Sequence, residues 1–121
     1  MIFKMLFDTY ALLEILKQNP NYEKYISTRV VINDFIFSEF CYKLFKENVK
    51  NAEDYIEEVA PAIIHADSDL IKEAMRFRVA NKKKNLSMTD CISYIMAKRL
   101  GIKFLTGDKE FEKLEGVEFV K

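Results

Sequence analysis

Residues 86–111 read LSMTDCISYIMAKRLGIKFLTGDKEF and predict a helix, a tight turn, a buried strand and a second short helix. Gly101 stands where a left-handed C-terminal helix cap is expected. Asp90 and Asp108 stand where the two helices begin. A carboxylate in such a place can cap a helix, and it can also bind a metal ion or face a phosphate group at the edge of a sheet. The segment therefore predicts either a well-capped structural unit or one wall of a functional site.

Short apolar segments suited to buried strands recur along the chain and alternate with helical patterns. They occupy residues 2–7, 29–32, 62–64, 102–105 and 117–120. Such alternation is typical of a mostly parallel sheet covered by helices on both faces. With no repeat and no linker, residues 1–121 predict a single α/β domain with about five strands.

Composition limits the classes of function. The 19 basic and 19 acidic residues balance, so nucleic-acid binding would require a local basic patch. The chain has no apolar run of the ~20 residues needed to cross a bilayer, and its start does not resemble a signal peptide. Cys41 and Cys91 fall in predicted helices, which indicates reduced thiols. We therefore expect a cytoplasmic protein.

Four carboxylates stand where a parallel sheet could bring them together. Asp8 follows the first predicted strand, Glu39 lies in the helix after the second, and Asp108 follows the fourth. Asp90 begins the helix that leads into the fourth strand. Each also has a purely structural explanation, since the aspartates can cap helices and Glu39 can pair with Lys43 one turn away. Spacing alone leaves both interpretations open.

If the four carboxylates converge, the chemistry they allow is narrow. Close carboxylates repel and raise each other's pKa unless a cation lies among them. Ligands made only of oxygen suit Mg²⁺ or Mn²⁺, ions that can orient water for attack on a phosphodiester. The single histidine, His65, has no evident Ser or Cys partner, so we interpret it as structural.

The chain resembles the PIN-domain ribonucleases, especially the small prokaryotic VapC-type toxins. Four segments carry the resemblance: LFDT at 6–9, SEF at 38–40, LSMTDC at 86–91 and FLTGDKEF at 104–111. The resemblance implies the strand order 3-2-1-4-5, dependence on Mg²⁺ or Mn²⁺ and hydrolysis of RNA. It also implies that the catalytic and metal-binding residues are Asp8, Glu39, Asp90 and Asp108.

Two hydroxyl residues are expected to support this acidic set. Thr106 matches the position that often supports the first acidic residue in the family, and Thr9 follows Asp8 directly. Tyr10 departs from the pattern, because many members have a small polar residue there. A phenol at this position would narrow the cleft or form a hydrogen bond near it.

A basic cluster precedes the helix that begins near Asp90. It comprises Arg76, Arg78, Lys82, Lys83 and Lys84. Charge alone indicates a solvated surface, but beside an acidic metal site the same residues could contact RNA phosphates. The first half of the chain is rich in aromatic residues, a surplus of which would mark an interface. The resemblance likewise implies a homodimer and a small antitoxin that binds in a groove between the helices.

Two other functions remain open from the sequence. The first is a PIN-fold module with an idle acidic site, acting only through RNA or protein binding. The second is a phosphotransfer domain with Asp8 as nucleophile. The second is disfavoured because no second aspartate stands two residues after Asp8, as a phosphatase of the haloacid dehalogenase type would require.

Overall fold

The computed structural model describes residues 3–121. At its centre is a parallel sheet of four strands in the order β2-β1-β3-β4. These strands are β1 (Lys4–Phe7), β2 (Arg29–Val31), β3 (Lys103–Thr106) and β4 (Val117–Phe119). The β1 register sets Leu6 beside both Val31 and Phe104. All three side chains are buried, as expected for a parallel sheet covered on both faces.

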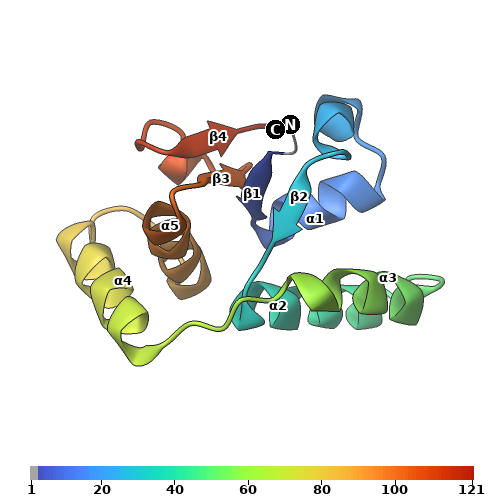
Figure 1. Ribbon diagram of the computed structural model, residues 1–121, viewed down its shortest axis with the longest axis horizontal. Coiled ribbons are helices and arrows are strands. Elements are labelled where there is room, and N and C mark those ends of the chain that lie inside the picture. The colour runs from blue at the N-terminus through green and yellow to red at the C-terminus, as the bar shows by residue number, and fades with distance from the viewer. Residues whose placement is uncertain (1–2) are drawn as a thin grey trace.

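Within residues 3–121, five α-helices and three short 3₁₀ helices surround the sheet. Figure 1 shows α1 and α5 on opposite sides of β1, α4 outside α5, and α2 and α3 together below the strands. The α-helices are α1 (Thr9–Leu16), α2 (Asp34–Lys46), α3 (Ala52–Val59), α4 (Ser68–Ala80) and α5 (Met88–Leu100). The 3₁₀ helices are η1 (Pro20–Tyr25), η2 (Ala60–Ala62) and η3 (Lys109–Phe111). No helix within residues 3–121 is long and apolar enough to cross a membrane.

The predicted α/β class, parallel sheet and strand order are confirmed, but the sheet formed by the described residues has four strands instead of about five. The third predicted strand, residues 62–64, forms only a single parallel bridge between Ile32 and Ile63. Pro61 contributes to the difference, because it lies inside η2, which includes Ala62, and it has no backbone N–H to donate to a strand ladder. The bridge at Ile63 lies next to β2, at the outer edge of the sheet. When the bridge is counted as the third strand, the order along the sheet is the predicted 3-2-1-4-5. The predicted start of the first strand at residue 2 lies outside the described residues.

Helix α5 is the most deeply buried helix and joins the two halves of the chain. Every residue from Cys91 to Ala97 is buried. Asn33, which caps α2, is fully buried and donates a hydrogen bond to Ser93 of α5 at 3.0 Å. Gly101 ends α5 at φ +68°, which confirms the left-handed cap expected from the sequence. The position of Asp90 at the start of α5 is thus fixed by a rigid, well-packed element.

Candidate metal-binding active site

Asp8 lies at the carboxyl end of β1, where both of its carboxylate oxygens accept hydrogen bonds. Oδ1 accepts from the backbone N–H of Ala11 at 2.7 Å and so caps α1. Oδ2 accepts from the hydroxyl of Thr106 at 2.5 Å. The side chain is 3% exposed. Asp8 is therefore both a helix cap and a carboxylate fixed at the edge of the sheet.

Thr106 connects Asp8 to the segment that carries Asp108. Its hydroxyl donates to Asp8 and accepts from the backbone N–H of Asp108 at 3.0 Å. The Asp108 carboxylate in turn accepts from the backbone N–H of Glu110 at 3.0 Å and caps η3. One buried hydroxyl thus links the Asp8 carboxylate to the backbone of Asp108, two residues that follow the ends of the neighbouring strands β1 and β3.

Glu39 reaches the same edge from the second turn of α2. Its Oε1 accepts a hydrogen bond from the Thr9 hydroxyl at 2.6 Å. The pairing with Lys43 considered from the sequence is not among the ion pairs that residues 3–121 form. The contact with Thr9 turns Glu39 towards the start of α1, and hence towards Asp8.

Asp90 lies in the first turn of α5, behind the cap residue Ser87. The Ser87 hydroxyl accepts from the backbone N–H of Asp90 at 3.0 Å, so the predicted helix start is correct. The structure brings all four carboxylates to a single cleft. Asp8, Asp90 and Asp108 come from the starts of helices, and Glu39 comes from the face of α2. The residues lining the cleft are Asp8, Thr9, Tyr10, Glu39, Ser87, Asp90, Gly107, Asp108 and Lys121.

Three of these cleft residues, Ser87, Gly107 and Lys121, were not singled out as site residues from the sequence. Ser87 could have been found, because a residue that caps the helix of Asp90 must lie close to it. Lys121 gives no such signal, since its position depends on how β4 ends beside α1. Thr106 does not line the cleft and is fully buried, yet it is bonded to the backbone or side chain of two residues that do.

Burial and mutual repulsion raise the pKa values of two of the carboxyls. Burial raises the pKa of Asp8 from 3.8 to about 6, with smaller contributions from the negative charges of Asp108 and Glu39; the two hydrogen bonds it accepts oppose the increase. Burial also raises the pKa of Asp90 to about 8, and the charge of Asp8 is the next largest cause. These four groups therefore lie close enough to destabilise each other's negative charge.

The donor set suits a hard divalent cation. Only carboxylate and hydroxyl oxygens line the acidic side of the cleft, which are the ligands that Mg²⁺ and Mn²⁺ prefer. A cation among the carboxylates would relieve the repulsion that raises their pKa values. Within residues 3–121, no three His, Cys, Asp or Glu side chains are already arranged to hold a metal ion. Binding would thus involve small side-chain adjustments, which the partly exposed Asp90 and the exposed Glu39 can make.

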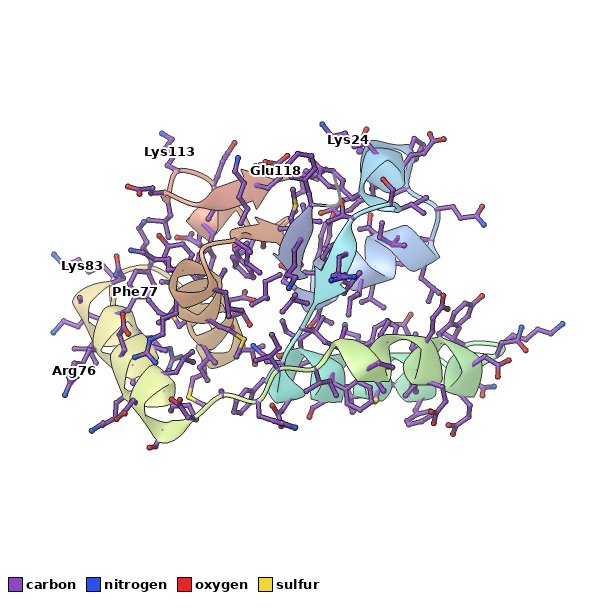
Figure 2. The ribbon with its side chains drawn as sticks, in the orientation of Figure 1. Lys24, Arg76, Phe77, Lys83, Lys113 and Glu118 are labelled. Carbon is purple, nitrogen blue, oxygen red and sulfur yellow. The ribbon has the colours of Figure 1, made fainter. Side chains whose placement is uncertain are left out.

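The basic cluster lies outside the acidic cleft, at the end of α4 and in the loop that follows. Arg78 Nε donates to the backbone oxygen of Leu86 at 3.0 Å, which ties the cluster to the residue before the α5 cap. A separate hollow is lined by Arg78, Lys82, Lys84 and four neighbours. Figure 2 shows Arg76 and Lys83 extending outward from this edge of the molecule. We call this surface, formed by Arg76, Arg78, Lys82, Lys83 and Lys84, the basic end of α4.

His65 does not take part in the cleft. Its Nδ1 lies 2.6 Å from Asp34 Oδ2, and its side chain is 80% exposed. Neither residue lines the acidic cleft. This contact gives His65 a local partner at the start of α2 and no place in the acidic site.

Comparison with known proteins gives the family. The PIN domain family model matches residues 5–117, so this chain belongs to the PIN-domain family. A search of curated proteins finds no significant match.

Solved structures agree in fold over nearly the whole chain. A toxin–antitoxin complex from Klebsiella pneumoniae matches with a TM-score of 0.76 at 18% identity, over 94% of this chain and 95% of that one. VapC20 of Mycobacterium tuberculosis, described as a sarcin–ricin-loop-cleaving toxin, gives 0.76 at 17% identity, over 97% and 99%. VapBC2 of Rickettsia felis, bound to a promoter DNA fragment, gives 0.71 at 14% identity, over 98% and 99%. The fold is therefore that of VapC-type toxins.

Proposed function

We propose that this protein is a divalent-metal-dependent endoribonuclease that hydrolyses RNA phosphodiester bonds. The observation that carries the proposal is the single cleft in which Asp8, Glu39, Asp90 and Asp108 meet. Membership of the PIN family and the fold shared with a sarcin–ricin-loop-cleaving toxin support RNA as the substrate class. When bound, Mg²⁺ or Mn²⁺ would neutralise charge on the phosphate and lower the pKa of an attacking water.

The chain's own residues would hold and orient these participants. Asp8 and Asp108 are fixed by Thr106, and Glu39 is oriented by Thr9. These four carboxylates would be the ligands of the ion. Each carboxylate has two oxygens, and one that is not used to hold the ion could accept a proton from water as the water oxygen bonds to phosphorus. The bond from phosphorus to the leaving oxygen then breaks, that oxygen takes up a proton from solvent water, and the carboxyl group returns its own proton to solvent.

The direct test is the variant Asp8→Asn with Asp108→Asn, assayed on single-stranded and structured RNA with Mg²⁺ or Mn²⁺. We expect cleavage to fall by more than about a hundredfold, since altering residues that only support metal ligands already reduces activity by roughly 10–100-fold. Asp69→Asn, an exposed carboxylate on α4, is the control and should cleave normally. Unchanged cleavage by the double variant would exclude the proposed active site.

A chelator distinguishes the active enzyme from an idle PIN-fold module. Cleavage should stop in excess chelator and return with Mg²⁺ or Mn²⁺. Calorimetry should show heat of binding at millimolar divalent metal in the wild type and a much smaller signal in the double variant. A protein that binds RNA but neither binds metal nor cleaves the RNA would be the idle module.

We further propose that the protein is the toxin of a toxin–antitoxin pair. Its structural relatives include toxin–antitoxin complexes from several bacteria. An apolar groove between α1, α2, α3 and η1 supplies a surface on which a small antitoxin could bind. Its lining includes Leu12, Leu16, Ile26, Tyr55 and Val59. Leu16→Asp should abolish inhibition by a co-expressed antitoxin without reducing the ribonuclease activity of the free protein.

Exposed aromatic residues on α2 support the expected homodimer. Tyr42 and Phe45 are 61% and 55% exposed, and because they are three residues apart on one helix face they form a continuous aromatic surface. Burying them between two copies would remove this surface from water. In size-exclusion chromatography with light scattering, we expect the wild type to run as a dimer and the double variant Tyr42→Glu with Phe45→Glu to run as a monomer.

A further inference from the structure

One basic side chain enters the acidic cleft. Of the residues in the described chain that line this cleft, Lys121 is the only one with a positive charge. It comes just after β4, the strand at the edge of the sheet. No other part of the acidic site comes from this end of the chain, so Lys121 is not explained by the metal site.

The backbone around Lys121 is held firmly. The Tyr22 hydroxyl donates to the backbone oxygen of Val120 at 2.6 Å. A main-chain oxygen of Lys121 accepts from the side-chain amides of Asn19 and Asn21, each at 3.3 Å. These three hydrogen bonds join η1 and its cap to the end of the β4 segment, more than 90 residues away in the sequence. The root of the Lys121 side chain is therefore fixed relative to the cleft.

The ammonium group of Lys121 also has a defined contact. Lys121 Nζ lies 5.1 Å from the centre of the Tyr10 ring, within the range of a cation–π contact. The ring is held edge-on against Tyr22, with centroids 6.2 Å apart. It also occupies the space beside Gly107, where a Cβ would come within 2.2 Å of a ring carbon. Tyr10 thus forms a rigid shelf that directs Lys121 into the cleft.

Lys121 is not used to neutralise the carboxylates. Among the ion pairs that residues 3–121 form, none joins Lys121 to a cleft carboxylate. The three N–H groups of its ammonium are therefore available to donate hydrogen bonds to a ligand. The carboxylates would repel every RNA phosphate apart from the one screened by the metal ion. A cation at the rim of the cleft would offset that repulsion for the neighbouring phosphate.

We propose that Lys121, seated on Tyr10, binds an RNA phosphate next to the scissile one and so sets the position of the strand in the cleft. This inference rests on the proposed ribonuclease function. It assigns Lys121 to substrate binding and Tyr10 to positioning Lys121. It also explains how the protein accommodates a large aromatic residue at position 10, because the ring supports a substrate contact.

The test is Lys121→Met, which keeps most of the side-chain volume and removes the charge. We expect KM for a short RNA to rise by about tenfold with little change in kcat, as for loss of one charged hydrogen bond. The salt slope, which is the slope of log affinity against log salt concentration, is measured by fluorescence anisotropy with the same RNA and the inactive Asp8→Asn/Asp108→Asn protein. Adding Lys121→Met to that protein should lower the salt slope by about one. Lys121→Arg should restore both KM and the salt slope.

Lys24→Met is a matched control. Lys24 lies 5.3 Å from the ring centre of Tyr25, a similar cation–π contact, but it is not among the residues lining the acidic cleft. Figure 2 shows it at the tip of η1. Lys24→Met should leave KM and the salt slope unchanged. An equal loss in both variants would overturn the inference, because it would reflect net charge and no specific contact.

Tyr10→Leu tests the positioning role. If the ring acts through Lys121, this change should raise KM and lower the salt slope in the wild type but have little further effect in Lys121→Met. Fully additive effects would contradict that role.

The remaining outcomes separate this inference from the proposed function. Wild-type cleavage with an unchanged salt slope in Lys121→Met would overturn the role of Lys121 and leave the ribonuclease intact. A higher KM without a change in slope would also overturn it, since that result indicates a structural effect. Absence of cleavage by the wild type would overturn the proposed function, and the inference with it.

Discussion

The acidic cleft and the basic end of α4 carry opposite charges and are built in opposite ways. In the cleft, Asp8 is buried and Thr106 fixes its orientation from a neighbouring strand. At the basic end of α4, all five cations are exposed, and in Figure 2 Arg76 and Lys83 extend into open space. A site that performs chemistry needs fixed geometry, whereas phosphate attraction needs only charge in roughly the right place. Changes in the cleft should thus have large, specific effects, and changes at the basic end small, general ones.

The largest effect should appear in stability, in the absence of divalent metal. Because the folded-state pKa of Asp8 is raised from 3.8 to about 6, its stabilising contribution is fully present below pH 3.8 and is lost as the pH rises through about 6. At 1.36 kcal/mol per pH unit, the loss is about 3 kcal/mol. The raised pKa of Asp90 extends the loss towards pH 8. Urea unfolding in chelator between pH 4 and pH 8 measures this decrease.

Asp8→Asn is the control for this pH dependence. Without the titrating group, its unfolding free energy should fall less steeply over the same range. When the chelator is replaced by millimolar Mg²⁺, the unfolding free energy of the wild-type protein at pH 8 should recover, because a bound cation stabilises the ionised carboxylates. A pH profile that is identical in the two proteins would show that Asp8 ionises as it would in the unfolded chain.

The next largest effect concerns Thr106, which sequence and structure both associate with the site although it lies beneath the cleft. Thr106→Val removes the hydroxyl that donates to Asp8 and accepts from Asp108, while keeping the shape of the side chain. We expect cleavage to fall by about 10–100-fold, with a higher metal concentration needed for half-maximal activity. The salt slope for RNA binding should not change. Loss of RNA affinity with metal affinity unchanged would contradict this role.

The smallest effect is expected at the basic end of α4. Lys83→Ala should weaken RNA binding by only a few-fold, equally for unrelated sequences, and reduce the salt slope by about one. The thermal midpoint should not change, since Lys83 is exposed. If the salt dependence is unchanged, the loop is an ordinary solvated surface and Lys83 contacts no phosphate.

The sequence predicted the features that depend on local patterns. Apolar runs located the four strands, and acidic residues located the helix starts at Asp8, Asp90 and Asp108. It was wrong in predicting a full strand at residues 62–64, where the β-compatible segment after Pro61 forms only one bridge, at Ile63. Short apolar runs are ambiguous because strand formation there depends on which neighbour is within reach.

The site was predictable to the extent that its members follow strand ends. Asp8 and Asp108 end adjacent strands, so their proximity follows from a parallel sheet. The position of Glu39 depends on the rotation of α2, and its contact with Thr9 gives no sequence signal. Lys121 could not be found, since its place results from side chains of η1 reaching across to the end of β4. Contacts between distant segments are the part of a site that local patterns do not encode.

The Thr106–Asp8 hydrogen bond joins residues that are 98 positions apart in the sequence. During synthesis on the ribosome, the first half of the cleft is made early, but it stays without its partner until β3 has emerged and paired with β1. Until then Asp8 and Glu39 are two isolated carboxylates on an incomplete sheet. A nascent chain of this protein thus has no assembled active site, so the activity proposed here would begin only after nearly all of the domain has been translated and folded.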